Sequence, residues 1–68
     1  MNTFTALIYR EGDLYVAECP EVGSVSQGLT IDEALANLKE ATELYLEENK
    51  FCPHSRTFIT TFEATAYA

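Results

Sequence analysis

Apolar and polar residues alternate near the N-terminus with the period of two that is typical of β-strands. Phe4, Ala6 and Ile8 share one face of a first predicted strand, and apolar residues on its other face favour cover on more than one side. The pattern resumes over residues 14–19 after the short polar break Glu11-Gly12-Asp13. These two segments therefore predict an antiparallel hairpin.

A third, short strand is predicted shortly after the hairpin. Pro20 ends the second strand because proline has no N–H to donate to a sheet ladder. Gly23 then permits a bend. The following residues, 24–27, favour a strand that Gly28 closes.

The central part of the chain predicts one long helix. Thr30 and Glu33 form a capping box, in which each side chain satisfies a free backbone N–H of the first turn. The run 31–49 contains no Gly or Pro, and its apolar residues fall on one face at steps of three and four. The residues of this predicted core face are Ile31, Ala34, Leu35, Leu38, Ala41, Thr42 and Tyr45.

A last strand is predicted over residues 56–65, where Phe58 and Phe62 alternate with Ile59 and Glu63. The order β-β-β-α-β makes the helix a crossover, so the last strand can lie parallel to the first. We therefore expect an α+β fold with one helix packed on a four-stranded sheet.

Composition restricts the class of protein. The chain has 68 residues, of which 47% are hydrophobic and 22% charged, as in ordinary globular proteins, so we expect a single domain over residues 1–68. Its formal charge of −7 would repel phosphate backbones, so we expect no direct nucleic-acid binding. No apolar run approaches the length of a membrane span, and Met1-Asn2-Thr3 lacks the basic start of a secretory signal. A cytoplasmic protein is the interpretation these features favour.

The residues offer little for catalysis, and we expect neither an enzyme nor a bound cofactor or metal. Cys52 and His54 could supply two soft ligands, but a zinc site needs three or four. Asp13, Glu18 and Glu21 could hold Mg²⁺ only if they converged, which their placement in one strand and two turns does not imply. Two cysteines are too few for a disulfide scaffold, so both thiols are expected to be reduced, with Cys19 packed rather than reactive.

Acidic residues on the helix are more informative. Glu33, Glu40 and Glu47 are spaced by seven, and Glu43 lies one turn before Glu47, so a negative ridge is expected away from the core. A ridge of this kind is either a solvated face or a surface that attracts a basic protein. Exposed sheet edges are a second possible docking surface. A chain this short has a small core, which favours a homodimer or higher oligomer.

The segment Tyr15-Val16-Ala17-Glu18-Cys19-Pro20-Glu21-Val22-Gly23-Ser24-Val25-Ser26-Gln27-Gly28, followed by Thr30-Ile31-Asp32-Glu33-Ala34 and Leu38-Lys39-Glu40-Ala41, resembles the HicB antitoxin family. The resemblance spans Tyr15 to about Glu48, half of the chain. It implies a partial RNase H-like fold of the HicB N-terminal type, an oligomer, and a small basic HicA-type toxin as partner. HicA toxins cleave mRNA, and binding of the antitoxin masks their active site.

Many HicB antitoxins continue into a domain that binds operator DNA, whereas this sequence ends at Ala68 after its last predicted strand, so autoregulation through DNA is not expected. The expected function is that of a HicB-like antitoxin. The alternative is an orphan homo-oligomeric binding module of unknown ligand, and a residual metal-dependent nuclease ranks third. The side chains expected to face a partner are Glu18, Glu21, Ser26, Gln27, Glu40, Glu43 and Glu47.

Overall fold

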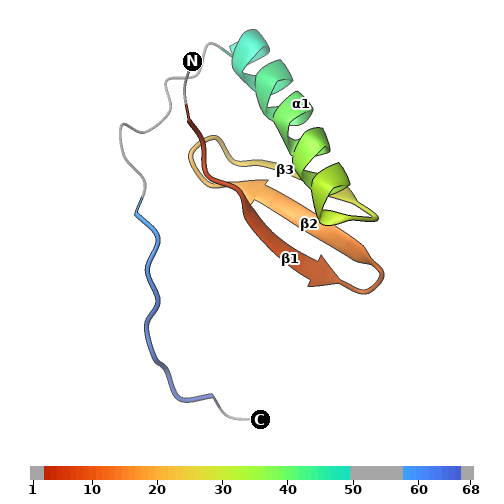
Figure 1. Ribbon diagram of the computed structural model, residues 1–68. Coiled ribbons are helices and arrows are strands. Elements are labelled where there is room, and N and C mark those ends of the chain that lie inside the picture. The colour runs from red at the N-terminus through yellow and green to blue at the C-terminus, as the bar shows by residue number, and fades with distance from the viewer. Residues whose placement is uncertain (1–2, 50–57, 67–68) are drawn as a thin grey trace.

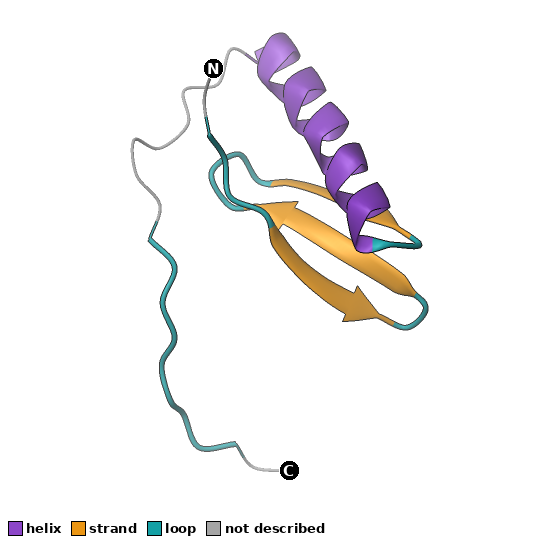
Figure 2. Ribbon diagram, viewed as in Figure 1, coloured by secondary structure: helices purple, strands orange, loops and turns teal. Residues whose placement is uncertain are grey.

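The computed structural model describes residues 3–49 and 58–66. Three strands, β1 (Leu7–Glu11), β2 (Leu14–Cys19) and β3 (Ser24–Gly28), are followed by one helix, α1 (Ile31–Asn49). The strands form an antiparallel sheet in the order β1-β2-β3. Figures 1 and 2 show α1 on one face of this sheet and residues 58–66 as an extended stretch apart from it. The predicted α+β class, the hairpin, the third strand and the helix are confirmed. β1 begins at Leu7, so Phe4 and Ala6 precede it, and among the described residues it is an edge strand, not one covered on more than one side.

The turns between the strands follow from the sequence. Glu11 pairs with Leu14, which leaves a two-residue loop, and Gly12 at its first position has a φ of 62°. Two-residue hairpin loops need such a positive φ, which glycine adopts without steric cost. After β2, the Gly23 N–H donates to the Cys19 carbonyl over 2.7 Å, which closes the bend into β3.

The start of α1 is capped by Thr30 and Glu33, but Glu33 bonds one residue before the Thr30 cap that the prediction gave it. The Thr30 hydroxyl accepts a hydrogen bond from the Glu33 N–H over 3.0 Å, and the Glu33 carboxylate accepts one from the Leu29 N–H over 2.9 Å. The Glu33 N–H is one of the first-turn donors that the helix itself leaves without a partner, whereas the Leu29 N–H precedes the helix. Gly28 lets this end approach the sheet closely, because a Cβ there would lie 2.6 Å from the Ala34 backbone nitrogen.

The core lies between α1 and the strands that it covers. Its buried residues are Ala17, Cys19, Val22, Ala34 and Leu38. The helix packs mainly on β3 and less extensively on β2. The predicted helical core face is therefore too wide, since Ile31, Leu35 and Tyr45 remain 48%, 44% and 41% exposed. A sheet of three strands does not extend far enough to cover the whole apolar stripe of this helix.

The predicted fourth strand is not observed. Residues 56 and 57 lie outside the described residues, and residues 58–66 form no strand and are exposed throughout. Alternation alone could not establish this strand, because a β-strand exists only where its backbone pairs with a neighbour. The sheet therefore has three strands in the part of the chain that the structure describes.

Candidate protein-interaction surfaces

An apolar groove of about 580 Å³ runs along one side of α1, where the N-terminal segment leads into β1. Its floor and walls are hydrophobic, and three charged side chains of the helix lie along it. The apolar lining residues include Phe4, Ala6, Leu35, Leu38 and Leu46, and the charged ones are Asp32, Lys39 and Glu43. The groove exists because the helix sits over β3 and β2, which leaves the β1 side of the sheet less covered.

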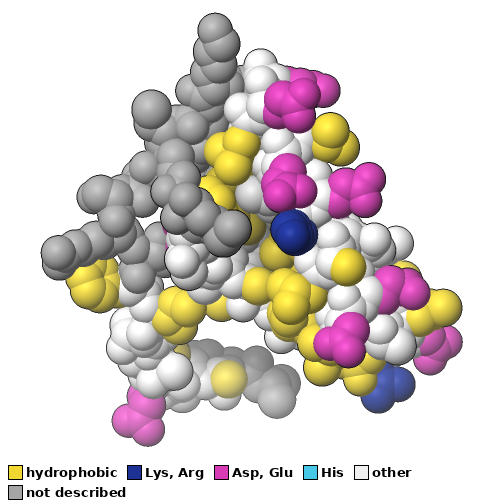
Figure 3. Space-filling model, turned by 45° about the horizontal axis from the view of Figure 1, so that its top comes forward, with side chains coloured by type: hydrophobic (Ala, Val, Ile, Leu, Met, Phe, Trp, Pro, Cys, Tyr) yellow, Lys and Arg dark blue, Asp and Glu magenta, His cyan; other side chains and the backbone are white. Residues whose placement is uncertain are grey.

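The acidic ridge lies on a different side of the helix. Glu33, Glu40 and Glu47 are all exposed, and none of them lines the groove. Asn37, which shares their side, donates a hydrogen bond over 2.8 Å to the Gln27 carbonyl of β3. This bond places the ridge above the β3 edge. Figure 3 shows acidic side chains spread along the helix surface and hydrophobic ones gathered beside it.

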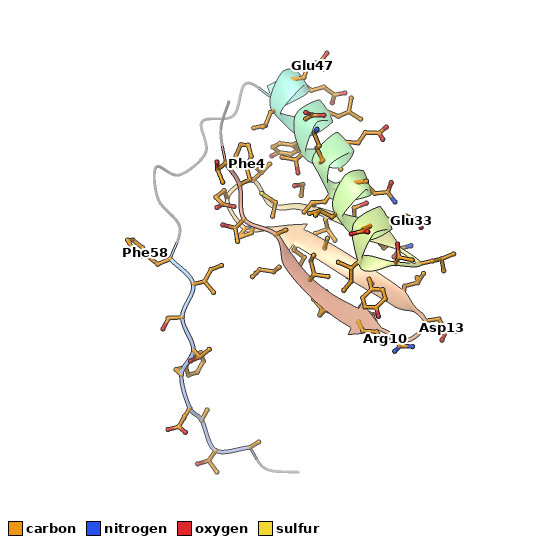
Figure 4. The ribbon with its side chains drawn as sticks, viewed as in Figure 1. Phe4, Arg10, Asp13, Glu33, Glu47 and Phe58 are labelled. Carbon is orange, nitrogen blue, oxygen red and sulfur yellow. The ribbon has the colours of Figure 1, made fainter. Side chains whose placement is uncertain are left out.

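The three helical glutamates that were expected to act together are therefore divided. Glu40 and Glu47 belong to the ridge, whereas Glu43 lies at the groove beside Lys39. Figure 4 shows Glu47 at the C-terminal end of α1, pointing away from the sheet, and Glu33 near the other end. The helical period accounts for these directions, because steps of seven return to nearly the same side, whereas Glu43 is turned by about 60° from Glu40 towards Lys39 and the groove.

The sheet face opposite α1 is open. The register places Glu18 between Leu7 and Val25, and these two apolar side chains are 41% and 57% exposed. A hydrogen bond with the Glu18 carboxylate, together with burial and nearby negative charge, raises the pKa of Tyr9 on this face. Gln27 is exposed here as well. The face thus combines apolar and polar groups, as protein-interaction surfaces commonly do.

Ser26 does not share this open face. It pairs with Ala17, a fully buried residue, and is itself half-buried on the helix side of the sheet. Successive residues of a strand point to opposite faces, so Ser26 and Gln27 cannot act on one partner surface. The predicted cluster at one end of the sheet is thus divided between its two faces.

Glu21 is held inside the domain. Its side chain is only 8% exposed, and its carboxylate accepts hydrogen bonds from the Thr5 hydroxyl (2.6 Å) and from the Thr5 N–H (3.0 and 3.2 Å). Burial alone would raise the pKa of this carboxyl, but these hydrogen bonds outweigh it and lower the pKa to about 2. Glu21 therefore fastens the N-terminal segment to the β2–β3 connection, and the prediction that it faces a partner is wrong.

Cys19 completes this buried group. Its thiol is 1% exposed and donates to the Glu21 carboxylate over 3.4 Å. Burial raises the pKa of Cys19, which keeps the thiol protonated and unreactive. The prediction that Cys19 is packed is confirmed, whereas Cys52 and His54 lie outside the described residues.

The described residues include neither a set of metal ligands nor a membrane-spanning helix. Among residues 3–49 and 58–66, no group of three His, Cys, Asp or Glu side chains could hold a metal ion. Asp13 lies in the turn before β2, whereas Glu21 follows the other end of β2 and is buried. No helix in that part of the chain is long and apolar enough to cross a bilayer.

Sequence reasoning missed the groove and the open apolar positions around it. A usable signal was present, because the apolar stripe of the helix is wider than a three-stranded sheet can cover. Leu35 belongs to this stripe, and Phe4, from the segment before β1, lines the same groove.

These surfaces define a small α+β domain that exposes an apolar groove, an open sheet face and an acidic helix ridge. The chain belongs to the UPF0150 family: it is 47% identical over 47 residues to the UPF0150 protein ssr1258 of Synechocystis sp. (strain ATCC 27184 / PCC 6803 / Kazusa). The matched region covers 66% of this chain and 68% of that relative. No family model and no solved structure matches the chain.

Proposed function

We propose that this protein is a HicB-like antitoxin that binds and neutralises a small basic mRNA-cleaving toxin of the HicA type. The observation that carries the proposal is the acidic ridge of α1, in which Glu33, Glu40 and Glu47 are exposed on one side of the helix. The net charge of −7 and the resemblance of residues 15–48 to HicB antitoxins support it. Complementary charge would speed the encounter with a basic toxin and would select against acidic proteins.

The placement of the ridge disfavours a purely structural role. The C-terminal end of a helix carries a partial negative charge, so acidic side chains there reduce stability. Glu47 and Glu48 occupy this end, and the last turn of α1 contains no basic residue. Acidic residues at this end lower the stability of the helix. Their presence is therefore consistent with selection for binding a cation-rich partner rather than for stability.

Opposite effects on stability and binding provide the test. The double variant Glu40→Lys/Glu47→Lys should be more stable than the parent, by about 0.5 kcal/mol, because a positive charge at position 47 interacts favourably with the C-terminal end of the helix. Its association with the toxin should be about tenfold slower at low salt, and this difference should shrink at high salt. Glu11→Lys is the control, since Glu11 is exposed in β1 at the hairpin, away from the ridge.

The toxin for this measurement is recovered by a tagged pull-down from the host lysate at low salt. It must be small and basic, and its RNA cleavage must be inhibited at one equivalent of this protein. Urea unfolding gives the stability, and stopped-flow or surface binding gives the association rate. Unchanged association in the double variant, or an equal loss in Glu11→Lys, would place the interface away from the ridge.

The proposal includes a fourth strand in the sheet. In the HicB-like arrangement, residues 58–65 pair in parallel with the free edge of β1 and add the fourth strand of a partial RNase H-like sheet. The edge of β1 has no strand beside it in the described part of the chain, and the segment alternates Phe58, Thr60 and Phe62 with Ile59 and Thr61. As an antitoxin of this type the protein would act in the cytoplasm, as a homo-oligomer and without direct nucleic-acid contact.

A second candidate is an orphan homo-oligomeric binding module of unknown ligand. The apolar groove favours it, because a groove of this character takes an apolar side chain or ligand rather than a basic surface. A pull-down that returns only the bait, as an oligomer, would support this module over the antitoxin.

A further inference from the structure

The C-terminal segment and the groove beside α1 have complementary apolar surfaces. Phe58 and Phe62 are 83% and 88% exposed, and Figure 4 shows Phe58 pointing away from the rest of the domain. The radius of gyration is 13.8 Å, compared with about 11 Å for a compact chain of this length. Large exposed aromatics and an open apolar groove in one small chain indicate that each is covered in the assembled protein.

The free edge of β1 offers backbone hydrogen-bond partners to an extended segment that would cover the groove. Its outer N–H and C=O groups face no strand among the described residues. The segment 58–65 contains no Gly or Pro and places Phe58 and Phe62 on one side of an extended chain. Paired beside β1, this side can face the groove, while Ile59 continues the open sheet face next to Leu7.

We propose that two copies of this protein exchange their C-terminal segments, so that residues 58–65 of one copy pair along β1 of the other and fill its groove with Phe58 and Phe62. This inference rests on the fourth strand proposed above and adds that a second copy of the chain supplies it. Figure 1 shows the segment extended away from its own domain, which is the shape of a protomer in an exchanged pair. Each copy has one donor and one acceptor, so a reciprocal exchange closes with two-fold symmetry.

Charge does not oppose this pairing, although each chain carries −7. The acidic ridge lies on the side of α1 above β3, whereas the groove and β1 lie on the other side. The segment 58–65 has a single charged residue, Glu63, which alternation places on the side opposite the two phenylalanines. Exchange therefore brings only neutral side chains of the segment to the groove, along which Asp32, Lys39 and Glu43 lie.

The first experiment measures mass as a function of concentration by sedimentation. The parent should be a dimer of twice 7.6 kDa. Phe58→Asp/Phe62→Asp should raise the dimer dissociation constant about 100-fold or more, the loss expected from two buried phenylalanines. Thr61→Asp/Thr65→Asp adds the same charge at the same spacing on the other side of the segment and should leave the dimer intact. A monomeric parent, or equal dimerisation of all three proteins, would overturn the proposal.

The second experiment identifies the donor by disulfide formation in a Cys52→Ser background, in which Cys19 is buried. One preparation carries Leu7→Cys and the other carries Ile59→Cys or, one register step on, Thr61→Cys. After unfolding and refolding together, they should form a covalent dimer that contains one chain of each kind.

Double variants that carry both cysteines in one chain show whether the fourth strand pairs within its own chain or with a second copy. If they close within the chain at monomer mass, while the mixed single variants stay unlinked, the fourth strand stands but the exchange is refuted. If neither set forms a disulfide, both the fourth strand and the exchange are refuted. The antitoxin proposal is tested separately, because its readout is the association rate of ridge variants.

Discussion

The buried carboxylate of Glu21 gives the sharpest test of how this small domain is held together. Glu21→Gln keeps the shape of the side chain but removes its charge. The carboxylate accepts from two donors of Thr5 and from the Cys19 thiol, and a glutamine cannot accept all of these bonds through one oxygen. Charge-assisted hydrogen bonds contribute about 1.5–3 kcal/mol, so the variant should lose about 2 kcal/mol of unfolding free energy at pH 7.

The pH dependence carries the stronger prediction. The pKa of Glu21 is lowered from 4.5 to about 2 on folding, so its contribution is complete above pH 4.5 and is lost as pH falls towards 2. The stability difference between parent and Glu21→Gln should therefore shrink from about 2 kcal/mol at pH 7 towards zero near pH 2. The difference between the pKa of Glu21 in the unfolded protein and in the folded protein limits this stability difference to about 3 kcal/mol.

Urea unfolding followed by circular dichroism at pH 7, 4 and 2.5, at one protein concentration, measures these differences. Glu40→Gln is the matched control, because Glu40 is exposed on the ridge and should change stability little at any of these pH values. A Glu21→Gln variant as stable as the parent at pH 7, or equally destabilised at pH 7 and 2.5, would refute the role assigned to Glu21.

Two further substitutions test the contact between α1 and β3. Gly28→Ala places a Cβ 2.6 Å from the Ala34 backbone nitrogen and should cost about 2 kcal/mol in thermal or urea unfolding, and an unchanged midpoint would contradict the close approach. Ser24→Ala removes one partner of the buried 2.6 Å hydrogen bond to the Thr42 hydroxyl and should cost about 1–3 kcal/mol. The double variant Ser24→Ala/Thr42→Val should cost less than the sum of the two single changes, and strict additivity in this cycle would show that the hydroxyls are not coupled.

Local signals in the sequence were enough to predict most of the elements. The polar break Glu11-Gly12-Asp13 between two alternating segments predicts a hairpin, and Thr30 with Glu33 marks the start of α1. Both signals act through residues close in the chain, where the backbone conformation depends on neighbours rather than on distant packing. The helix covers Ile31–Asn49, the run without Gly or Pro that the sequence predicts to be helical.

The candidate surface was predicted only in part, because exposure depends on what a residue packs against. The ridge residues Glu40 and Glu47 are exposed as helical periodicity indicates. Glu21 was expected to face a partner, yet it turns inward to the N–H and hydroxyl of Thr5, sixteen residues earlier in the chain. A contact of that separation leaves no periodic signature, so the direction of a turn residue could not be read from its neighbours.

For this protein, the sequence by itself determined the elements, the caps and turns that bound them, and the acidic side of the helix, because each depends on short-range geometry. Tertiary structure alone decided that α1 lies over β3 and β2, that a groove opens beside Phe4 and Leu35, and that residues 58–66 stay apart from their own sheet. These features depend on which surfaces meet in space. An alternating segment such as Phe58 to Thr65 becomes a strand only when a neighbouring backbone is present to pair with it.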